Sequence, residues 1–392
     1  MGGKGQQCVA RNCRAPVNAA APERQPGKRK ARVALVTEVD FWLAGAGHRA
    51  RIQALVRHLS QHVALTVVVP LVLQGAQRAQ IAAVVPHAGL VSLGLPAQVT
   101  LDAALTRLQA FFEHTPQDAC IIEYLSLGWL RRAIPRGVLT LVDTHDVASS
   151  RDADFLRFGQ QPAWPTIDAA QERARLSLFD RVLAICQPDA EVFAEWVGAE
   201  RVVLVPHAVG QAPQVVRPVA RRVLFVGSAY APNLLGLRWF MDTVWPRVAA
   251  AGLTLDVVGT AGLTLSRPLP DSVIVHGIVP DLEPAYAAAD LCVNPVRFGS
   301  GLKIKTVEAL AHGRPLITTT HGMRGLEPWA GRAFVVADSV AEFAQALVDL
   351  IWRQYARARL ATEGLSLVKS DFSPDVCYGP LLKELDALVE AS

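Results

Sequence analysis

A glycine turn between an apolar strand and a helix carries the clearest chemical signal in the sequence. The run reads Asn294-Pro-Val-Arg-Phe-Gly-Ser-Gly-Leu-Lys-Ile-Lys-Thr-Val-Glu308, and we expect the helix to begin near Leu302. Backbone N–H groups at the start of a helix lack partners within it, and the helix dipole makes that end positive. Lys303 and Lys305 add positive charge where a free helix end would favour acids. The segment therefore predicts an anion site, for example for a phosphate.

This turn is similar to a P-loop but departs from it at one position. The Walker pattern requires Gly where Ile304 stands, so the sequence does not indicate an ATPase. Glu308 lies about two helical turns beyond the glycines, where a carboxylate could accept hydrogen bonds from two ribose hydroxyls. Taken alone, Glu308 fits a surface position equally well.

His145 is the second candidate for chemistry. It follows the predicted strand Val138–Val142, at the carboxyl end where open α/β sheets bind ligands. Asp143 and Asp146 flank it, and either could orient the imidazole. A loop histidine with an ordinary structural role is the alternative.

Metal binding is not predicted. Asp152-Ala-Asp154 has the D-x-D pattern of some metal sites, but it lies in a polar stretch expected to be helical rather than after a strand. His58 and His62 are one helical turn apart and lack a third ligand. The six cysteines include no C-x-x-C pair, so we expect no zinc site and no disulfide framework. No cofactor is expected.

Two series of alternating strands and helices would position these residues. Continuous apolar strands separated by helices are typical of a parallel sheet covered on both faces. The predicted strands are Val33–Thr37, Leu65–Val69, Ala119–Glu123, Val138–Val142, Val182–Ile185 and Val202–Val205, then Val223–Val226, Leu255–Val258, Val273–Val275, Leu291–Val293, Leu316–Thr319 and Phe334–Val336. The predicted helices include His48–Leu59, Leu101–Phe112, Asp189–Trp196, Leu234–Val248, Lys305–Ala311 and Ser339–Trp352. We expect two doubly wound, Rossmann-like domains that face a cleft.

The domain boundaries follow from where this pattern stops and restarts. We assign a disordered basic tail to residues 1–31 and the first domain to residues 32–208. A linker without periodicity spans residues 209–221, and the second domain spans residues 222–372. Residues 373–392 are expected to form a helix that packs back on the first domain.

Composition limits the classes of function. The longest apolar stretch, Val63–Leu73, is interrupted by Thr66 and Pro70 and is too short for a membrane span. The net charge is +4, but residues 1–32 hold eight basic residues against one acid, which leaves −3 for the rest. This tail could contact an anionic membrane surface, and a solubilising extension is the alternative. Basic and aromatic residues do not cluster elsewhere, so no nucleic-acid partner is expected. The predicted location is cytoplasmic, with peripheral contact at the inner face of the membrane.

A longer series of motifs resembles the nucleotide-sugar domain of family 4 glycosyltransferases, which have the GT-B fold. The series also fits the subgroup with Gly-x-Gly-x-basic-x-basic before the ribose-binding Glu. It consists of Val223-Leu-Phe-Val-Gly-Ser-Ala-Tyr-Ala-Pro-Asn233, Val257-Val-Gly259, His276-Gly-Ile-Val-Pro-Asp281, Tyr286-Ala-Ala-Ala-Asp290 and the run Gly299–Glu308. Shorter segments are similar to the acceptor domain of that family: Gly45-Ala-Gly-His-Arg49, Asp143-Thr-His-Asp146 and Phe179–Cys186.

The resemblance implies a metal-independent hexosyltransferase-type enzyme. It would move a sugar from a nucleotide-diphosphate donor, with retention at the anomeric carbon, to a glycan, lipid-linked or protein-linked acceptor. His145 and Lys303 would be the catalytic residues, with His145 beside the transferred sugar, and Glu308 would hold the ribose. The other implied donor-binding residues are Gly47, Gly227, Ser228, Val279, Gly299, Ser300, Gly301, Leu302 and Lys305. The implied acceptor-binding residues are His48, Arg49 and Asp146.

Two departures from the family pattern leave alternatives open. Many members have Glu where this chain has Ser300, and many have Arg and Lys within the segment Ser228–Asn233. A GT-B nucleotide-sugar epimerase, a sugar phosphorylase and a non-catalytic binding partner share the fold and stay in consideration. A dinucleotide-dependent oxidoreductase is disfavoured because neither half has G-x-G-x-x-G after its first strand. The nucleotide, the sugar and the oligomeric state are not specified by the sequence.

Overall fold

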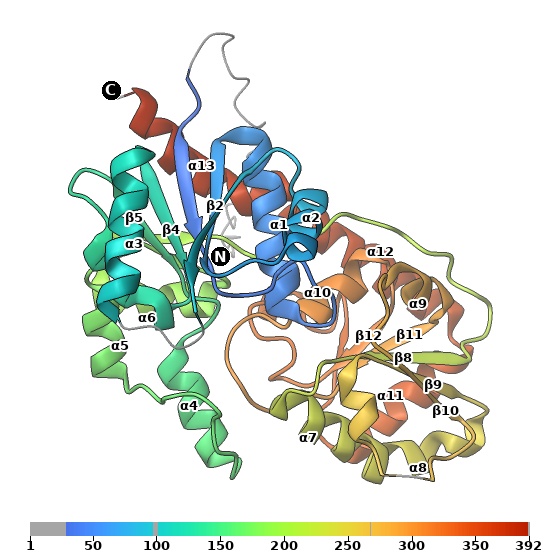
Figure 1. The fold of residues 1–392 in the computed structure, drawn as a ribbon. Coiled ribbons are helices and arrows are strands. Elements are labelled where there is room, and N and C mark those ends of the chain that lie inside the picture. The colour runs from blue at the N-terminus through green and yellow to red at the C-terminus, as the bar shows by residue number, and fades with distance from the viewer. Residues whose placement is uncertain (1–28, 97–100, 267, 391–392) are drawn as a thin grey trace, which may run out of the picture.

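Two α/β domains lie side by side in the computed structural model, which describes residues 29–96, 101–266 and 268–390 (Figure 1). The first sheet has the strand order β3-β2-β1-β4-β5-β6-β7, and the second has the order β10-β9-β8-β11-β12-β13. Every strand pair in both sheets is parallel. The strands of the first sheet are β1 (Arg32–Val36), β2 (Ala64–Leu71), β3 (Gly89–Leu95), β4 (Ala119–Glu123), β5 (Leu139–Asp143), β6 (Arg181–Ala184) and β7 (Val202–Leu204). Those of the second are β8 (Arg222–Val226), β9 (Thr254–Val258), β10 (Val273–Gly277), β11 (Leu291–Asn294), β12 (Leu316–Thr318) and β13 (Val335–Val336).

Helices connect these strands in both domains. In the first domain they are α1 (Gly47–His62), α2 (Gly75–Val84), α3 (Leu101–His114), α4 (Ala148–Arg157), α5 (Ala169–Leu176) and α6 (Gln187–Val197). In the second they are α7 (Ala231–Trp239), α8 (Trp245–Val248), α9 (Glu283–Ala288), α10 (Ile304–Ala311), α11 (Val340–Trp352) and α12 (Gln354–Asp371), followed by α13 (Pro374–Glu390). Short 3-10 segments complete the connections at Leu125–Ala133, Ala199–Arg201, Ala249–Ala251, Thr260–Thr264 and Glu327–Trp329. The predicted doubly wound α/β class is confirmed. No helix of the described residues combines the length and apolarity needed to cross a bilayer.

Every predicted strand is present with ends within two residues of those expected, because buried parallel strands are nearly continuous apolar runs. The edge strand β3 was not predicted, since its sequence GLVSLGL contains two glycines and is only partly buried. The predicted helix Leu234–Val248 begins earlier, at Ala231, and contains a π-helical turn at Phe240–Val244. Pro246, which has no N–H to donate, lies directly after that turn.

The core consists of three clusters of buried apolar side chains. One cluster covers one face of the first sheet, and another fills one face of the second sheet beneath α11. The third contains residues of both domains, from Val33 and Leu35 in β1 to Val307 and Leu310 in α10. Burying each such side chain stabilises the fold by about 1.5–3 kcal/mol, so this shared cluster also holds the two domains together.

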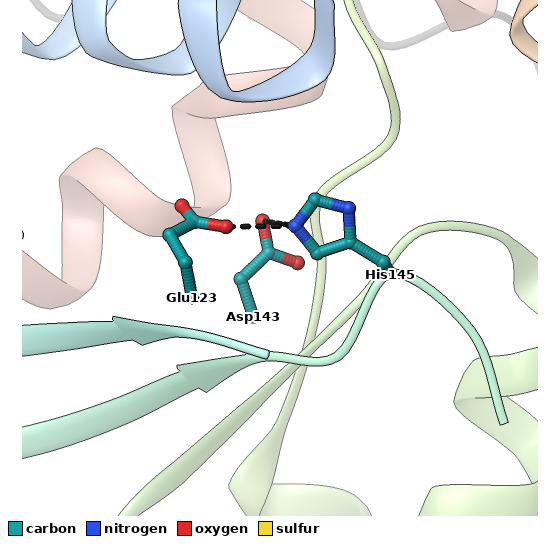
Figure 2. Close-up of side chains that lie close together, drawn as sticks. All are labelled: Glu123, Asp143 and His145. Carbon is teal, nitrogen blue, oxygen red and sulfur yellow. Dashed lines mark hydrogen bonds and ion pairs between the residues drawn. The ribbon is translucent and has the colours of Figure 1, made fainter. Parts of the chain in front are cut away.

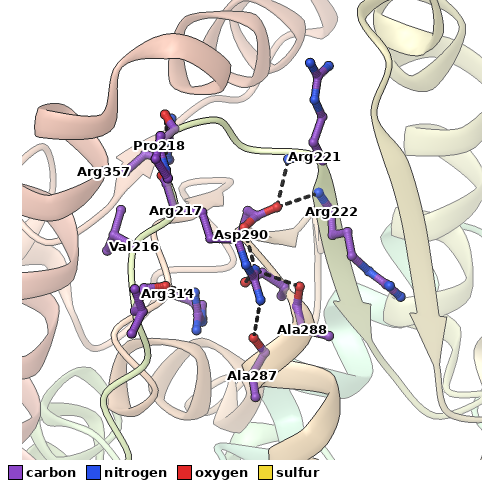
Figure 3. A network of polar contacts seen from close by, with 12 residues as sticks. Val216, Arg217, Pro218, Arg221, Arg222, Ala287, Ala288, Asp290, Arg314 and Arg357 are labelled. Carbon is purple, nitrogen blue, oxygen red and sulfur yellow. Dashed lines mark hydrogen bonds and ion pairs between the residues drawn. The ribbon is translucent and has the colours of Figure 1, made fainter.

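The connecting segment between the domains is held against the second domain by hydrogen bonds, many of them made by Asp290 and Arg357 (Figure 3). Asp290, just before β11, accepts a hydrogen bond from the Arg217 guanidinium at 2.7 Å. Its other oxygen accepts from the backbone N–H groups of Arg221 and Arg222 at 2.8 and 2.9 Å. Buried Arg357 donates to the carbonyls of Arg217 and Pro218. The segment predicted to be a linker therefore has fixed contacts although it contains no helix or strand.

Both ends of the described chain belong to the first domain. Helix α13 contacts α1 and β7, so the chain returns from the second domain to the first, as its red ribbon shows in Figure 1. Ala31 is fully buried, and the Arg29 guanidinium lies 2.6 Å from the Asp118 carboxylate. Residues 29–31, which the sequence assigned to the tail, are thus part of the domain. Residues 1–28 of that predicted tail lie outside the described residues.

Candidate functional site

The glycine turn leads from β11 to the first residue of α10. Gly299 and Gly301 have φ angles of +96° and +69°, a region that side chains with a Cβ rarely adopt. Lys303 is the N-cap of α10, so the helix begins at Ile304, between the two starts predicted from the sequence, near Leu302 and at Lys305. The positive end of α10 is therefore directed toward this turn, as the anion-site prediction requires.

The turn touches the loop that carries His145, across the interface between the domains. A Cβ on Gly301 would lie only 2.7 Å from the backbone oxygen of His145, so only glycine permits this approach. The Ser300 hydroxyl donates to the Asp146 carboxylate at 2.8 Å. The Gly299 N–H donates to the Asp154 carboxylate in α4 at 3.2 Å. Two acids of the first domain thus lie on the turn that was predicted to bind an anion.

Both lysines of this segment are held by neutral acceptors. The Lys303 ammonium donates to the carbonyls of Gly299, Ser300 and Gly301 at 3.3, 2.9 and 3.0 Å, which fixes the shape of the turn. The Lys305 ammonium donates to the Asn233 side chain at 2.5 Å. Burial and the neighbouring charge of Arg324 lower the pKa of Lys303 to about 8, and burial and the charge of Lys303 lower the pKa of Lys305 to about 7. An anion bound here would be stabilised by both lysines.

Glu308 lies on α10, three residues beyond Lys305. Its carboxylate accepts a hydrogen bond from the hydroxyl of buried Tyr286 at 3.3 Å. Burial raises the pKa of Glu308, and the Tyr286 hydrogen bond and the charge of Lys305 partly offset this rise. Tyr286 stacks on the ring of His312, which fixes the orientation of its hydroxyl.

His145 lies beyond the end of β5, and its Nε2 is 2.7 Å from the carboxylate of Glu123 (Figure 2). Its ring stacks on Tyr124, with centroids 4.0 Å apart and planes 14° from parallel. The sequence suggested Asp143 or Asp146 as the orienting acid. In the structure the Asp143 carboxylate lies 3.9 Å from Nε2 of His145, and the Asp146 carboxylate is hydrogen-bonded to Arg151 and Ser300 instead. The acid in contact with the imidazole is therefore Glu123.

Glu123, Asp143 and His145 lie close enough together that a metal ion could bridge them. Arg51 in α1, however, donates to both oxygens of Asp143 at 3.0 and 2.7 Å, and both side chains are fully buried. A guanidinium that occupies both ligand oxygens disfavours a second cation at the same carboxylate. In the structure the three side chains are joined to each other and to Arg51 by hydrogen bonds and ion pairs.

The other predicted donor-side residues lie around this interface. A Cβ on Gly47 would lie 3.4 Å from Ile304 at the start of α10. Ser228 is linked to Lys305 through Asn233, whose amide donates to the Ser228 carbonyl at 3.0 Å. Leu302 is buried in the shared core, and the Gly227 N–H donates to the Val258 carbonyl. Val279 is half-buried and follows Ile278, whose side chain lies next to Gly45.

The predicted acceptor-side residues are less closely gathered. The His48 ring lies 6.4 Å from that of Tyr124, edge to face, and so borders the His145 site. The Arg49 guanidinium is turned away to the Asp40 carboxylate at 2.6 Å. Asp146 lies at the interface, where it is shared between Arg151 and Ser300.

Three residues of the site were not identified from the sequence: Glu123, Arg51 and Asp154. Glu123 had a detectable signal, because it is the only charged residue of an otherwise apolar strand and stands at its carboxyl end. Arg51 sits on the buried face of α1, where a charged residue implies a partner. Asp154 was considered only as a metal ligand, and its contact with Gly299 spans 145 residues, beyond what sequence patterns show.

Comparisons with known proteins show similarity to glycosyl transferases in the second domain. Residues 220–352 match the family described as glycosyl transferases group 1. A Klebsiella pneumoniae protein described as an uncharacterized 44.6 kDa protein in the cps region is 23% identical over 175 residues, which are 41% of this chain and 45% of that protein. The chain thus matches less than half the length of this relative.

Solved structures share the fold over nearly the whole chain. Sucrose-phosphate synthase from Thermosynechococcus elongatus is 17% identical, with a TM-score of 0.69 over 92% of this chain and 99% of that one. Anabaena Alr3699/HepE, solved in complex with UDP and glucose, is 13% identical, with a TM-score of 0.67 over 91% and 100%. S. aureus TarM is 8% identical, with a TM-score of 0.71 over 93% and 100%. The chain therefore has the GT-B fold, and its second domain carries the similarity to glycosyl transferases group 1.

Proposed function

We propose that this protein is a glycosyltransferase that takes a sugar from a nucleotide-diphosphate donor bound between its two domains. The observation that carries the proposal is the meeting of the Gly299–Gly301 turn, from the domain that matches glycosyl transferases group 1, with the loop of His145. The turn and the start of α10 suit a diphosphate, and Glu308 on the same helix suits a ribose. His145, across the interface, suits the sugar at which transfer occurs.

The finer parts of the proposal follow from the same side chains. Bond cleavage leaves negative charge on the departing diphosphate, which the backbone N–H groups of α10, Lys303 and Lys305 would stabilise without a metal. We further propose that the sugar is a hexose transferred with retention of anomeric configuration. The acceptor would be a sugar on a glycan, lipid carrier or protein.

The test is product analysis with a panel of nucleotide sugars, with and without added glycan acceptors. A transferase releases nucleotide diphosphate and forms an acceptor-linked sugar. Sugar epimerisation without acceptor would indicate the epimerase alternative, and product formed only with free phosphate would indicate a phosphorylase. A folded protein that binds a nucleotide but yields no product from any donor would contradict the proposal of catalysis.

One prediction concerns the acid that now lies on the turn. Asp154→Ala should tighten binding of a nucleotide diphosphate about 3- to 10-fold, because it frees the Gly299 N–H, and one hydrogen bond is worth about 0.5–1.5 kcal/mol. Asp154→Asn keeps an oxygen at this position and should give a smaller gain. Isothermal titration of the three proteins measures the difference. Equal affinities would show that Asp154 does not compete with the ligand.

A second prediction concerns pH. The pKa values of about 7 and 8 for Lys305 and Lys303 mean that these groups lose protons as pH rises from 7 to 9. A bound diphosphate would raise both pKa values, so binding takes up protons and its affinity falls with rising pH in this range. We expect a fall of about 3- to 10-fold per pH unit between pH 7 and 9, and little dependence on these lysines below pH 7.

Titrations in buffers of different ionisation enthalpy measure this proton uptake. Lys305→Arg is the matched control, because arginine keeps its charge throughout the range and should reduce the pH dependence. Affinity that does not change between pH 7 and 9 would show that the two lysines do not bind the phosphates.

A further inference from the structure

The environment of Glu123 differs from that of the neighbouring acid. Asp143 pairs with Arg51 through two hydrogen bonds, whereas Glu123 has a single hydrogen-bond partner among the described residues, the Nε2 of His145 at 2.7 Å. The second oxygen of Glu123 is buried and has no hydrogen bond to any residue that the structure describes. The side chain is inaccessible to solvent. An ionised carboxylate in this position would add a second buried negative charge beside Asp143, and Arg51, which attracts it, is already paired with Asp143, so the charged form is unfavourable.

The protonated acid satisfies this geometry better. A neutral carboxylic acid can donate its O–H to Nε2, and it leaves a carbonyl oxygen whose burial costs less than that of a charged oxygen. Burial and the nearby charge of Asp143 raise the pKa of Glu123 well above its ordinary value, although the charge of Arg51 opposes this rise. Burial also lowers the pKa of His145 to about 4, so the imidazole is neutral at pH 7.

The backbone holds the two residues in register for this contact. Glu123 and Asp143 are paired neighbours on β4 and β5, and His145 follows two residues later. Tyr124 and His145 have φ angles of +69° and +61°, and among the described residues they are the only non-glycine residues with positive φ. Backbone strain of this kind persists where surrounding contacts enforce it, and it is frequent at functional sites. In this backbone conformation the Tyr124 ring stacks on the imidazole of His145, and the stacking leaves the imidazole little freedom to turn.

From these contacts we infer that Glu123 is a positioning residue that donates a proton to Nε2 of His145 and so fixes the tautomer with hydrogen on Nδ1. Nδ1 points away from both carboxylates in Figure 2 and makes no hydrogen bond to a described residue. Its N–H is therefore free to donate to a ligand oxygen. This inference rests on the proposed function: the ligand would be a hydroxyl of the transferred sugar, or the oxygen that leaves the anomeric carbon with the diphosphate. At this position the first domain then offers the ligand a hydrogen-bond donor, the Nδ1–H of His145, rather than an acceptor.

The test is nitrogen NMR of histidine-labelled protein without any ligand, with the His145 signals assigned from the spectrum of His145→Gln. We expect Nδ1 of His145 to be protonated and Nε2 to be unprotonated and hydrogen-bonded near pH 7. Glu123→Gln, whose amide can still donate, should keep this tautomer. Glu123→Met, of similar size without a donor, should lose it. A wild-type spectrum with the proton on Nε2, or a Glu123→Met spectrum identical to wild type, would overturn the inference.

Activity gives a second reading. Glu123→Met should lower kcat about 10- to 100-fold with nearly unchanged nucleotide affinity, because a misplaced group loses its effect in the transition state while the donor still binds. Glu123→Gln should retain most of the activity. Equal kcat in wild type and Glu123→Met would also overturn the inference. The NMR experiment needs no substrate, so it tests the tautomer independently of the proposed function. If the proposed function were wrong, nucleotide binding would be absent while the tautomer of His145 stayed as expected.

Discussion

His145→Ala is expected to lower turnover of the nucleotide sugar about 100- to 1,000-fold, the usual loss for one donor aimed at developing charge. The backbone oxygen of His145 lies against Gly301 at the interface, and the imidazole is held by Glu123 and Tyr124. Its position suits contact with the sugar rather than with the nucleotide. Steady-state kinetics should therefore show the loss in kcat, while donor affinity measured by titration stays nearly constant.

A matched control separates this role from general damage. His114 is exposed at the end of α3 and bonds only to its own helix, so His114→Ala should behave as wild type. If His145→Ala weakened donor binding as much as turnover, the residue would be a binding group rather than a catalytic one. If it left turnover unchanged, the assignment of the reaction to this interface would be wrong.

Glu308→Ala is expected to weaken nucleotide binding by about 1.5–3 kcal/mol, the range for lost hydrogen bonds to a charged group. This is about a 10- to 150-fold rise in Kd. The carboxylate lies on α10 beyond the Gly299–Gly301 turn and is oriented by the Tyr286 hydroxyl. Titration with the nucleotide and with its 2′-deoxy analogue provides the measurement, because the variant should lose its preference for ribose.

Two further variants make this assignment specific. Tyr286→Phe removes only the hydroxyl that orients Glu308 and should have a smaller effect of the same sign. Asp242→Ala changes an exposed acid of the same domain and should have none. A Glu308→Ala protein that is folded and binds as wild type would remove Glu308 from the ribose site.

The sequence predicted most of the fold because parallel α/β sheets have a strong local signature. Continuous apolar strands such as Ala119–Glu123 are distinguishable from the amphipathic helices between them. What escaped prediction has weak local signals. The edge strand β3 contains glycines, and the fixed path of residues 209–221 depends on Asp290 and Arg357, which are distant in sequence.

The candidate site was predictable on one side only. The Gly299–Glu308 segment is contiguous, so its turn, its lysines and its glutamate could be read together. The His145 side is assembled from β4, β5, α1 and α4, and its contacts depend on strand register. Proximity in sequence favours Asp143 and Asp146 as the acid that orients His145, whereas the carboxylate in contact with the imidazole is that of Glu123 on the adjacent strand. The approach of Asp154 to Gly299 depends on how the two domains meet.

The most direct test of the central claim is calorimetric titration of the purified protein with UDP, GDP, ADP, CMP and dTDP. We predict that one nucleotide binds selectively and that Glu308→Ala loses most of this affinity. Selective binding would also restrict the donor to sugars carried by that base. A folded protein that binds none of the five would contradict the claim that a nucleotide sugar binds at the turn between β11 and α10.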